Sequence, residues 1–508
     1  MIKRFNWAFL LLGLVGLAVI LQFSTSNAFD TDSLYHIKHS FLYRTEGIFS
    51  GAFPWTQYSV ISTYAADLWY GFHILTLPLS WFSDLGTGIK VGGVLVTVIS
   101  GLLVFAAFRR LKIKWPAMWV LVFLFATADV LYRFAMFRPH PLSLGLALLI
   151  FTYLNTESSR FSKIILFLAG FFFSWTHLSL SWLPILVWAV TAAVQILQKK
   201  KIYWQGPVAM ASGLIGGLLL RPNPFGAAKL AYIQVVQLLF EKKLPLRFGR
   251  ELIPFSWENF VDQLVPITIA LAMAIIFLIW MIRKKERQQS SVWASLILAV
   301  IFFFLTFAVA RRSNEVFVGF VVIFMALLFE RYRAVAARIK LRSIVALLAL
   351  VLVIYAPIKT VYRFDTYLAN TFPIDHFKDA ALWLKENSRP GDVVFNIHWD
   401  RFADLFFWNN SNYYINGMDP IFEYSFKPEL YWKTHFLAID AGTAFTCGMI
   451  RCTAEQTEDT YKVLKNDFRA SYIVVEKLRN PKLLQYLQSF VGYQKVFDNN
   501  AQTVFRIM

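Results

Sequence analysis

The sequence near the N-terminus reads WAFLLLGLVGLAVILQF over Trp7–Phe23 and NAFDTDSLYHIKHSFLYRT over Asn27–Thr45. The first stretch is uncharged and long enough to cross a bilayer core of about 30 Å as a helix. The second places two carboxylates, Asp30 and Asp32, just beyond the membrane and follows them with histidines and bases. This order predicts chemistry on a charged or phosphate-bearing substrate at the membrane surface. Helix capping is the alternative role, because Asp and Ser favour N-caps and loops.

The composition is that of a membrane protein. Of all residues 57% are apolar and 16% are charged, a balance typical of polytopic chains. The net charge of +19 would indicate nucleic acid in a soluble protein. Here the Lys and Arg residues form short clusters between apolar runs, which positive-inside topology explains, so we expect no nucleic-acid partner. Two cysteines, Cys447 and Cys452, exclude a disulfide framework but can form one local disulfide outside the cytoplasm.

Apolar runs and basic clusters alternate as far as residue 372. Lys3 and Arg4 precede the first run and place the N-terminus in the cytoplasm. A removable signal peptide ending near Ala28 is the alternative, although the first run exceeds the usual apolar core of such peptides. The clusters change sides consistently over about eleven crossings. The ten that follow the first are expected at residues 88–108, 115–132, 142–154, 164–175, 182–197, 206–220, 264–282, 292–310, 316–329 and 344–362. Residues 69–82 are apolar but contain Pro78, and we expect them to be re-entrant or interfacial.

The predicted fold is therefore a polytopic α-helical membrane protein of about 11 transmembrane helices with a C-terminal extracytoplasmic α/β domain. Residues 1–372 form the transmembrane part, with residues 27–70 as its first outer loop. From residue 373 the periodicity becomes that of a soluble domain. Strands are expected at residues 392–397, 472–475, 493–497 and 503–507, and helices at 375–387, 457–468 and 481–490. By the number of crossings this domain lies outside the cytoplasm, beside the acidic loop.

Transfer of a group from a phosphate-bearing substrate needs two things from an enzyme. One is a carboxylate that takes the proton of the acceptor, for which Asp32, or Asp30, is the candidate. The other is positive charge to hold the departing phosphate. The candidates for that role are Arg138, Lys242, Arg311 and Arg312, which all lie on the predicted outer side. Interfacial snorkelling is the ordinary alternative for each of these bases.

Histidines and further acids extend this set of candidates. His36 and His140 can bind phosphate or metal, or can be hydrogen-bonded structural residues. Asp30 and Asp32 can hold Mg²⁺ or Mn²⁺ through hard oxygen donors, and Glu251 and Glu258 can complete such a site. A solvated acid in a basic loop is the alternative for both glutamates. No glycine loop that would cradle a nucleotide phosphate appears in the C-terminal part, which argues against a nucleotide-sugar donor.

These features together resemble the C-type glycosyltransferase superfamily, polytopic enzymes that use lipid-phosphate sugars, and in organisation the oligosaccharyltransferase catalytic subunits. Asp30-Thr31-Asp32 stands where these families carry an acidic motif after the first membrane helix, and Tyr35-His36 follows as in the oligosaccharyltransferases. Trp399 and Asp400 match two positions of the family's Trp-Trp-Asp-Tyr-Gly motif, which reads the acceptor peptide; the other three positions differ. The second paired-acid motif is reduced to Asp129.

The resemblance implies an inverting membrane glycosyltransferase that takes sugar from a polyprenyl phosphate or diphosphate on the outer face. Its partners would be that lipid-linked sugar, membrane lipids, and a glycan, lipid or protein acceptor. An oligosaccharyltransferase acting on protein is the nearest alternative, and the incomplete acceptor motif argues against it. A lipid or sugar transporter or flippase is the alternative from another class, but the expected crossings are nearly free of charge. An inactive relative kept as an assembly subunit is a third.

Overall fold

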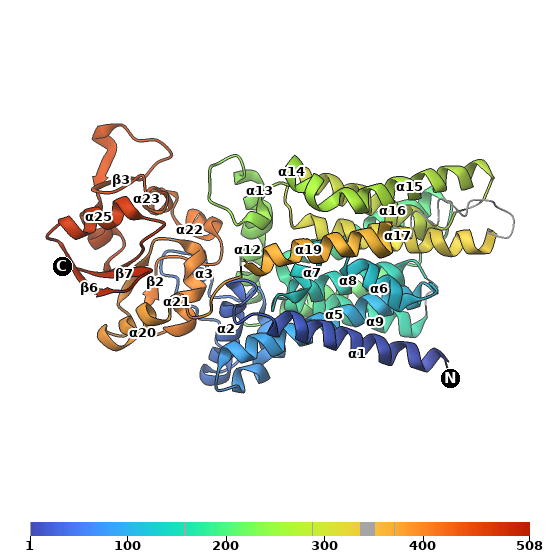
Figure 1. Cartoon of the computed structure of the whole chain (residues 1–508), viewed down its shortest axis with the longest axis horizontal. Coiled ribbons are helices and arrows are strands. Elements are labelled where there is room, and N and C mark those ends of the chain that lie inside the picture. The colour runs from blue at the N-terminus through green and yellow to red at the C-terminus, as the bar shows by residue number, and fades with distance from the viewer. Residues whose placement is uncertain (1, 157–158, 287, 336–350, 370) are drawn as a thin grey trace.

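Long helices run side by side in an elongated bundle, and a β-sheet with its own helices lies beyond one end of that bundle (Figure 1). This computed structural model describes residues 2–156, 159–286, 288–335, 351–369 and 371–508. Its longer bundle helices are α1 (Ile2–Phe23), α5 (Leu85–Arg110), α8 (His140–Leu154), α9 (Arg160–Thr176), α10 (Trp182–Leu197), α11 (Gln205–Leu219), α15 (Val265–Arg283), α16 (Ser290–Ala308), α17 (Ser313–Val335) and α19 (Ala356–Ala369). Shorter elements between them are α6 (Pro116–Leu124), α7 (Ala128–Ala135), α12 (Pro224–Tyr232), η3 (Ile233–Gln237), α13 (Leu238–Glu241), η4 (Arg250–Leu252), α14 (Trp257–Asn259), η5 (Phe260–Leu264) and η7 (Val351–Tyr355).

The bundle helices coincide with the crossings predicted from hydropathy. Among the described residues, five helices are long and apolar enough to span a membrane, or up to six if a bent pair counts as one. The bent pair is α6 and α7, which meet at 97°. The apolar helices Trp7–Phe23, His140–Leu154 and Gln205–Leu219 fall short of that length. Part of the last predicted crossing, residues 344–350, lies outside the described residues. The number of eleven crossings therefore stays a prediction.

The segment after α1 forms an outer layer between the bundle and the sheet (Figure 1). It contains α2 (Asp32–Glu46), α3 (Val60–Tyr64), α4 (Tyr70–Thr76) and η1 (Leu77–Trp81). The apolar residues 69–82 thus fold into two short helices, both packed on α2. Pro78 lies at the start of η1, where a missing N–H costs nothing. Because α2 also packs on α21 of the C-terminal part, its two faces join bundle and sheet.

Residues 393–507 contribute the strands of one mixed sheet. These are β1 (Val393–Asn396), β2 (Tyr413–Tyr414), β5 (Ala470–Glu476), β6 (Tyr493–Asp498) and β7 (Gln502–Ile507), in the order β2-β1-β5-β7-β6. β1 pairs in parallel with β2 and β5, and β7 pairs antiparallel with β5 and β6. The surrounding elements are α20 (Lys378–Asn387), η8 (Trp399–Arg401), α21 (Phe402–Trp408), α22 (Pro420–Phe426), α23 (Pro428–Ala438), η9 (Ala454–Gln456), α24 (Thr460–Lys462), η10 (Val463–Asp467) and α25 (Pro481–Ser489).

The helix predicted at residues 457–468 is wrong in its first turn. β3 (Phe445–Cys447) and β4 (Thr457–Asp459) form an antiparallel pair, so residues 457–459 are a strand rather than the start of a helix. Helical structure begins only at Thr460, with the Asp459 side chain as its N-cap. Strand pairing across the intervening loop overrides the local helical pattern here. Cys447 and Cys452 in that loop form a disulfide.

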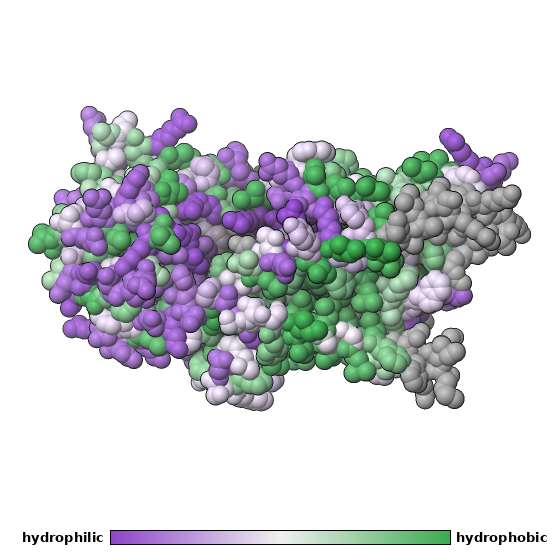
Figure 2. All heavy atoms as spheres, in the orientation of Figure 1, coloured by the Kyte–Doolittle hydropathy of each residue, from purple (hydrophilic) through white to green (hydrophobic). Residues whose placement is uncertain are grey.

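The surface of the molecule divides in the same way as the fold. Figure 2 shows hydrophobic residues covering the bundle and hydrophilic residues gathered over the sheet end. Exposed apolar side chains on the bundle helices include Phe9, Leu12, Ile185 and Ile276. Such an apolar belt needs lipid rather than water around it. The chain is an integral membrane protein.

Candidate active site

The two acids of the opening motif sit at the start of α2 and do not cap it. The N-cap residue is Thr31, and no side chain there makes a capping hydrogen bond. Asp30 accepts a hydrogen bond from the Ser33 hydroxyl, and Asp32 is the first residue of the helix. The capping alternative therefore does not explain the Asp32 carboxylate. Both acids turn instead toward a guanidinium group from another part of the chain.

That group is Arg138, in the segment between α7 and α8. Its Nη2 forms an ion pair with Asp32 Oδ2, and its Nε lies 3.3 Å from Asp30 Oδ2. Its Nη1 donates to Glu251 Oε2 at 3.2 Å. One arginine thus gathers three carboxylates from two separate segments. The sequence predicts Arg138 as a phosphate ligand, and the structure places it against both predicted catalytic acids.

Glu251, in η4, contacts three arginines of the site. It accepts from Arg133 Nη1 at 2.5 Å and also pairs with Arg312. Arg133 Nε in turn donates to Glu315 Oε1 at 3.1 Å, at the start of α17. The ionic cluster therefore consists of three arginines (Arg133, Arg138 and Arg312) and four acids (Asp30, Asp32, Glu251 and Glu315).

A small cavity opens beside this cluster. Its lining residues come from α2, α7, the start of α8 and the segment between them, from η3 and η4, and from the short η2 (Leu178–Leu180) with the residue before it. The segments that precede α4, α17 and α22 supply the others. They are Asp32, His36, Trp69, Arg133, Arg138, Pro139, His140, His177, Ser179, Gln234, Glu251, Arg312, Met418 and Asp419. Met418 and Asp419 belong to the C-terminal part, so that part closes one wall of the cavity. The arginines supply the fixed positive charge and N–H donors that a phosphate-bearing substrate requires, and the acids lie beside them.

The electrostatics of the two acids differ from those of Glu251. Burial raises the pKa of Asp30 to about 6, although Arg138 opposes the shift. Burial likewise raises the pKa of Asp32 against the effect of Arg138. The pKa of Glu251 is held well below its usual range, because burial is outweighed by Arg312, Arg133 and Arg138. Glu251 is thus held as an anion, whereas burial raises the pKa of both Asp30 and Asp32, the direction that favours a role in proton transfer.

The remaining predicted residues fall into two groups. His36, His140 and Arg312 line the cavity as expected for substrate contact, and His140 Nε2 lies 3.5 Å from Glu315 Oε2. Arg311 lies beside the cluster but is occupied by Asp129, with Nη2 2.6 Å from Oδ1. Asp129, which the sequence offers in place of a second acidic motif, is therefore a partner of Arg311.

Lys242, Trp399, Asp400 and Glu258 are not among the residues that line the cavity. Lys242 Nζ donates to the Leu252 carbonyl at 2.6 Å, and Trp399 Nε1 to the Arg247 carbonyl at 2.9 Å. Asp400 pairs with Arg479 at 3.2 Å. Glu258 is exposed on α14. The structure thus brings Glu251, rather than Glu258, to the acid pair.

Sequence reasoning missed Arg133, Glu315 and Asp419 as site residues. Arg133 counted only as the basic end of a crossing, and Asp419 lies far along the chain. Glu315 carried a usable signal, because it is an acid in the first turn of an apolar helix directly after Arg311-Arg312. Ionisable groups at such positions are costly and mark function more often than not.

Comparison with known proteins gives likeness in structure rather than in sequence. No protein-family model matches the chain, and no curated protein matches it. Its structure is similar to the archaeal oligosaccharyltransferase AglB from Archaeoglobus fulgidus, solved in complex with an inhibitory peptide and a dolichol-phosphate. The TM-score is 0.58 at 13% identity, over 97% of this chain and 73% of that one.

Two structures of ArnT from Cupriavidus metallidurans match over almost the whole of both chains. The apo form gives a TM-score of 0.53 at 12% identity, over 99% of this chain and 98% of that one. The form bound to undecaprenyl phosphate gives 0.53 at 10% identity, over 98% and 97%. The chain shares its fold with AglB and ArnT, and the architecture that the resemblance in its sequence implies is confirmed at the level of the fold.

Proposed function

We propose that this protein is a membrane glycosyltransferase that moves a sugar from a polyprenyl phosphate or diphosphate to an acceptor outside the cytoplasm. The observation that carries the proposal is the cavity lined by Asp32, Arg138 and Arg312, in which Arg138 pairs with Asp32 and also with Asp30 beside it. It lies in a fold shared with proteins solved with a dolichol-phosphate and with undecaprenyl phosphate. A glycan, a lipid or a protein can be the acceptor.

The proposed reaction is a single displacement that inverts the sugar. The acceptor oxygen or nitrogen forms a bond to the anomeric carbon, the bond from that carbon to the phosphate oxygen breaks, and Asp32 takes the acceptor's proton. Arg138 and Arg312 hold the leaving phosphate, exchanging part of their contact with Asp32 and Glu251 for the new anion. Because these guanidinium groups are already fixed by carboxylates, little reorganisation is needed when the phosphate arrives.

The acid pair also fits a divalent cation such as Mg²⁺ or Mn²⁺. Asp30 Oδ2 is buried and accepts no hydrogen bond from the described residues. The cluster contains more carboxylates than guanidinium groups, and carboxylate oxygens are the donors that these hard cations prefer. Asp30 and Asp32 would hold the ion, and Glu251 is the acid close to them. When bound, the ion would add positive charge for the leaving phosphate.

The orientation proposed for the chain puts the N-terminus in the cytoplasm and residues 373–508, as one α/β domain, outside it. The basic clusters support this by the positive-inside rule over about eleven crossings. The disulfide between Cys447 and Cys452 supports it independently, because such bonds persist outside the reducing cytoplasm. The five-stranded sheet formed within residues 393–507 supports a separate C-terminal domain.

Transfer to protein and transport of the lipid are less well supported. Trp399 and Asp400, the matches to the peptide-reading motif, bond to Arg247 and Arg479 rather than line the cavity. The acids and bases of the cluster lie at one end of the bundle and not along a path through it. That distribution favours chemistry at one membrane face over transport.

Binding of undecaprenyl phosphate to the purified protein tests the proposal. We expect binding that weakens by roughly tenfold or more when Arg138 and Arg312 are both changed to Gln, since each lost charge-assisted contact is worth about 1.5–3 kcal/mol. Arg250→Gln, an exposed base in the neighbouring η4, is the matched control and should bind normally. Equal binding by all three proteins would leave the arginines as structural residues and overturn the proposed site.

A further inference from the structure

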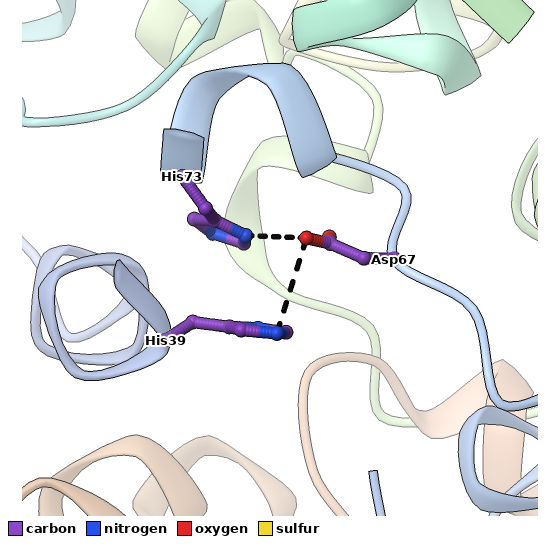
Figure 3. Close-up of side chains that lie close together, drawn as sticks. All are labelled: His39, Asp67 and His73. Carbon is purple, nitrogen blue, oxygen red and sulfur yellow. Dashed lines mark hydrogen bonds and ion pairs between the residues drawn. The ribbon is translucent and has the colours of Figure 1, made fainter. Parts of the chain in front are cut away.

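A second group of ionisable side chains lies behind the cavity wall, away from the ionic cluster. It consists of His39 on α2, Asp67 in the segment before α4, and His73 on α4 (Figure 3). All three are buried, and His73 has no exposed surface. Figure 3 shows both imidazole rings directed at the same carboxylate. His73 Nδ1 is 2.6 Å from Asp67 Oδ2, and His39 Nε2 is 3.9 Å from it.

The other nitrogen of each ring is also held. His39 Nδ1 lies 2.9 Å from the Tyr35 hydroxyl, and His73 Nε2 lies 2.8 Å from His36 Nδ1. The carboxylate is fixed in turn, because Asp67 Oδ1 accepts from the Trp69 N–H at 2.8 Å. Histidines that bind metal characteristically have their second nitrogen bonded to a polar group, which sets the tautomer and the ring orientation. Both histidines meet that condition.

From this arrangement we propose that His39, Asp67 and His73 form a binding site for zinc or a similar divalent transition-metal ion. Two imidazoles and one carboxylate are a donor set of zinc sites that keep a fourth position for another ligand. With Zn–N and Zn–O bonds near 2.0–2.1 Å, tetrahedral ligand atoms stand roughly 3.3 Å apart. The two separations from Asp67 Oδ2 lie on either side of that value, so side-chain shifts below about 1 Å complete the site.

The environment of His39 also favours its metal-binding form. Burial lowers the pKa of His39 to about 3, which keeps its ring neutral, as a ligand must be. The distance of 3.9 Å from His39 to the carboxylate is too long for a hydrogen bond. Asp67 Oδ2 bonds His73 and accepts from the Tyr43 hydroxyl at 3.0 Å, so it bonds only one of the two imidazoles that face it. A cation bound by all three residues would engage both imidazoles.

The metal would act on the cavity through His36. His73 bound to zinc by Nδ1 must carry its proton on Nε2, and it then donates to His36 Nδ1. Neutral His36 consequently carries its own proton on Nε2, an N–H donor for the cavity it lines. Without metal, the His73 Nδ1–H donates to Asp67, His73 Nε2 accepts from His36, and His36 Nε2 is left with a lone pair. Zinc therefore favours phosphate in the cavity, a consequence that rests on the proposed function.

The direct test is the zinc content of the purified full-length protein, prepared with a tag that contains no histidine. We expect about one zinc per chain in the wild type after zinc loading and removal of loose ions, and at least a tenfold loss in Asp67→Asn and in His39→Phe. The phenylalanine keeps the ring that stacks on Phe53 and His73. Asp84→Asn is the matched control with the same chemical change, because Asn also caps the exposed start of α5; it should keep the zinc.

Loading the wild type with Co²⁺ tests the same site without any substitution, so the result does not depend on whether the variants fold. We expect the visible absorption of four-coordinate Co²⁺, displaced by zinc. Absence of both zinc and this absorption in monodisperse wild type overturns the site and leaves a hydrogen-bonded core pair. Zinc retained equally by the folded Asp67→Asn and His39→Phe proteins overturns it too, because the ion then lies elsewhere.

The link to the cavity is measured separately with undecaprenyl phosphate. Loaded wild type should bind this lipid about fivefold or more tightly than metal-free wild type, and Asp67→Asn should show no difference. If the lipid binds neither form, the proposed function fails while the metal content still decides the site. If it binds both forms equally, zinc does not act through His36 and that consequence is wrong.

Discussion

Asp32→Asn isolates the charge of the predicted catalytic acid while keeping the shape of the side chain. Asp32 begins α2, lines the cavity and pairs with Arg138, and its side chain is 23% exposed. Loss of a general base costs about 10²–10⁴-fold in rate. At 1.36 kcal/mol per factor of ten, this is roughly 2.7–5.4 kcal/mol of transition-state stabilisation.

The effect of the same change on stability should be much smaller. Arg138 keeps Asp30 and Glu251 as partners, so the substitution leaves no buried cation alone. We expect a loss of about 1–2 kcal/mol from the free energy of unfolding, the value of one charge-assisted hydrogen bond. A large fall in rate with a small fall in Tm is therefore the signature of catalysis, and a structural role would lower both together.

The assay is sugar transfer by purified protein in lipid vesicles, with a polyprenyl-phosphate sugar as donor and Tm measured on each sample. Asp30→Asn belongs in the same series, and it should lose as much rate as Asp32→Asn only if both acids bind one cation. Asp84→Asn is the control. Near-normal transfer by folded Asp32→Asn would refute the reasoning, because the acid loop would then not be the catalytic centre.

Three further predictions follow from the ion pairs and the orientation. With the pKa of Asp30 raised to about 6 by burial, kcat/KM should fall about tenfold per unit below pH 6 if both acids bind one cation, and Asp30→Asn should remove this dependence. The folded state binds this proton more tightly than the unfolded chain, so the Asp30 contribution to stability should fall as pH rises toward 6. Urea unfolding of Asp30→Asn against wild type measures that contribution. Arg312→Gln should raise KM for the lipid donor with little change in Tm, whereas Arg311→Gln should lower Tm, because it leaves buried Asp129 without its guanidinium partner; the reverse pattern would exchange their roles. Alkaline phosphatase fused after Met508 should be active, and activity of a cytoplasmic reporter alone would place the C-terminal part on the other side.

Hydropathy and charge predicted the bundle helices because each apolar run must satisfy its own backbone within lipid. The same local signals located most C-terminal strands, such as β5 and the β6–β7 pair around Asn499-Asn500. The first turn of the helix expected at residues 457–468 was wrong, because the pairing of β3 with β4 is a contact between separate segments. A periodic pattern carries no information on such a partner.

In the site, too, local sequence identified single residues but not the contacts between distant segments. Position after the first apolar run was enough to select Asp30 and Asp32, and the basic clusters contained Arg138 and Arg312. What the sequence could not give is the pairing: Glu251 meets Arg133 across 118 residues of chain. Asp419 closes the cavity from a part of the chain with no visible connection to it. The sequence offered Glu251 and Glu258 alike, because nothing local distinguishes a solvated acid from one that three arginines contact.

The measurement that tests the central claim most directly is the content of lipid-linked sugars in cells that lack this chain. In those cells we expect a polyprenyl-phosphate-linked sugar to accumulate and its usual acceptor to lose that sugar. Wild type and Asp84→Asn should reverse both changes, and Asp32→Asn should not. Unchanged lipid-linked sugars and acceptors in the deletion cells, or full reversal by Asp32→Asn, would contradict the claim.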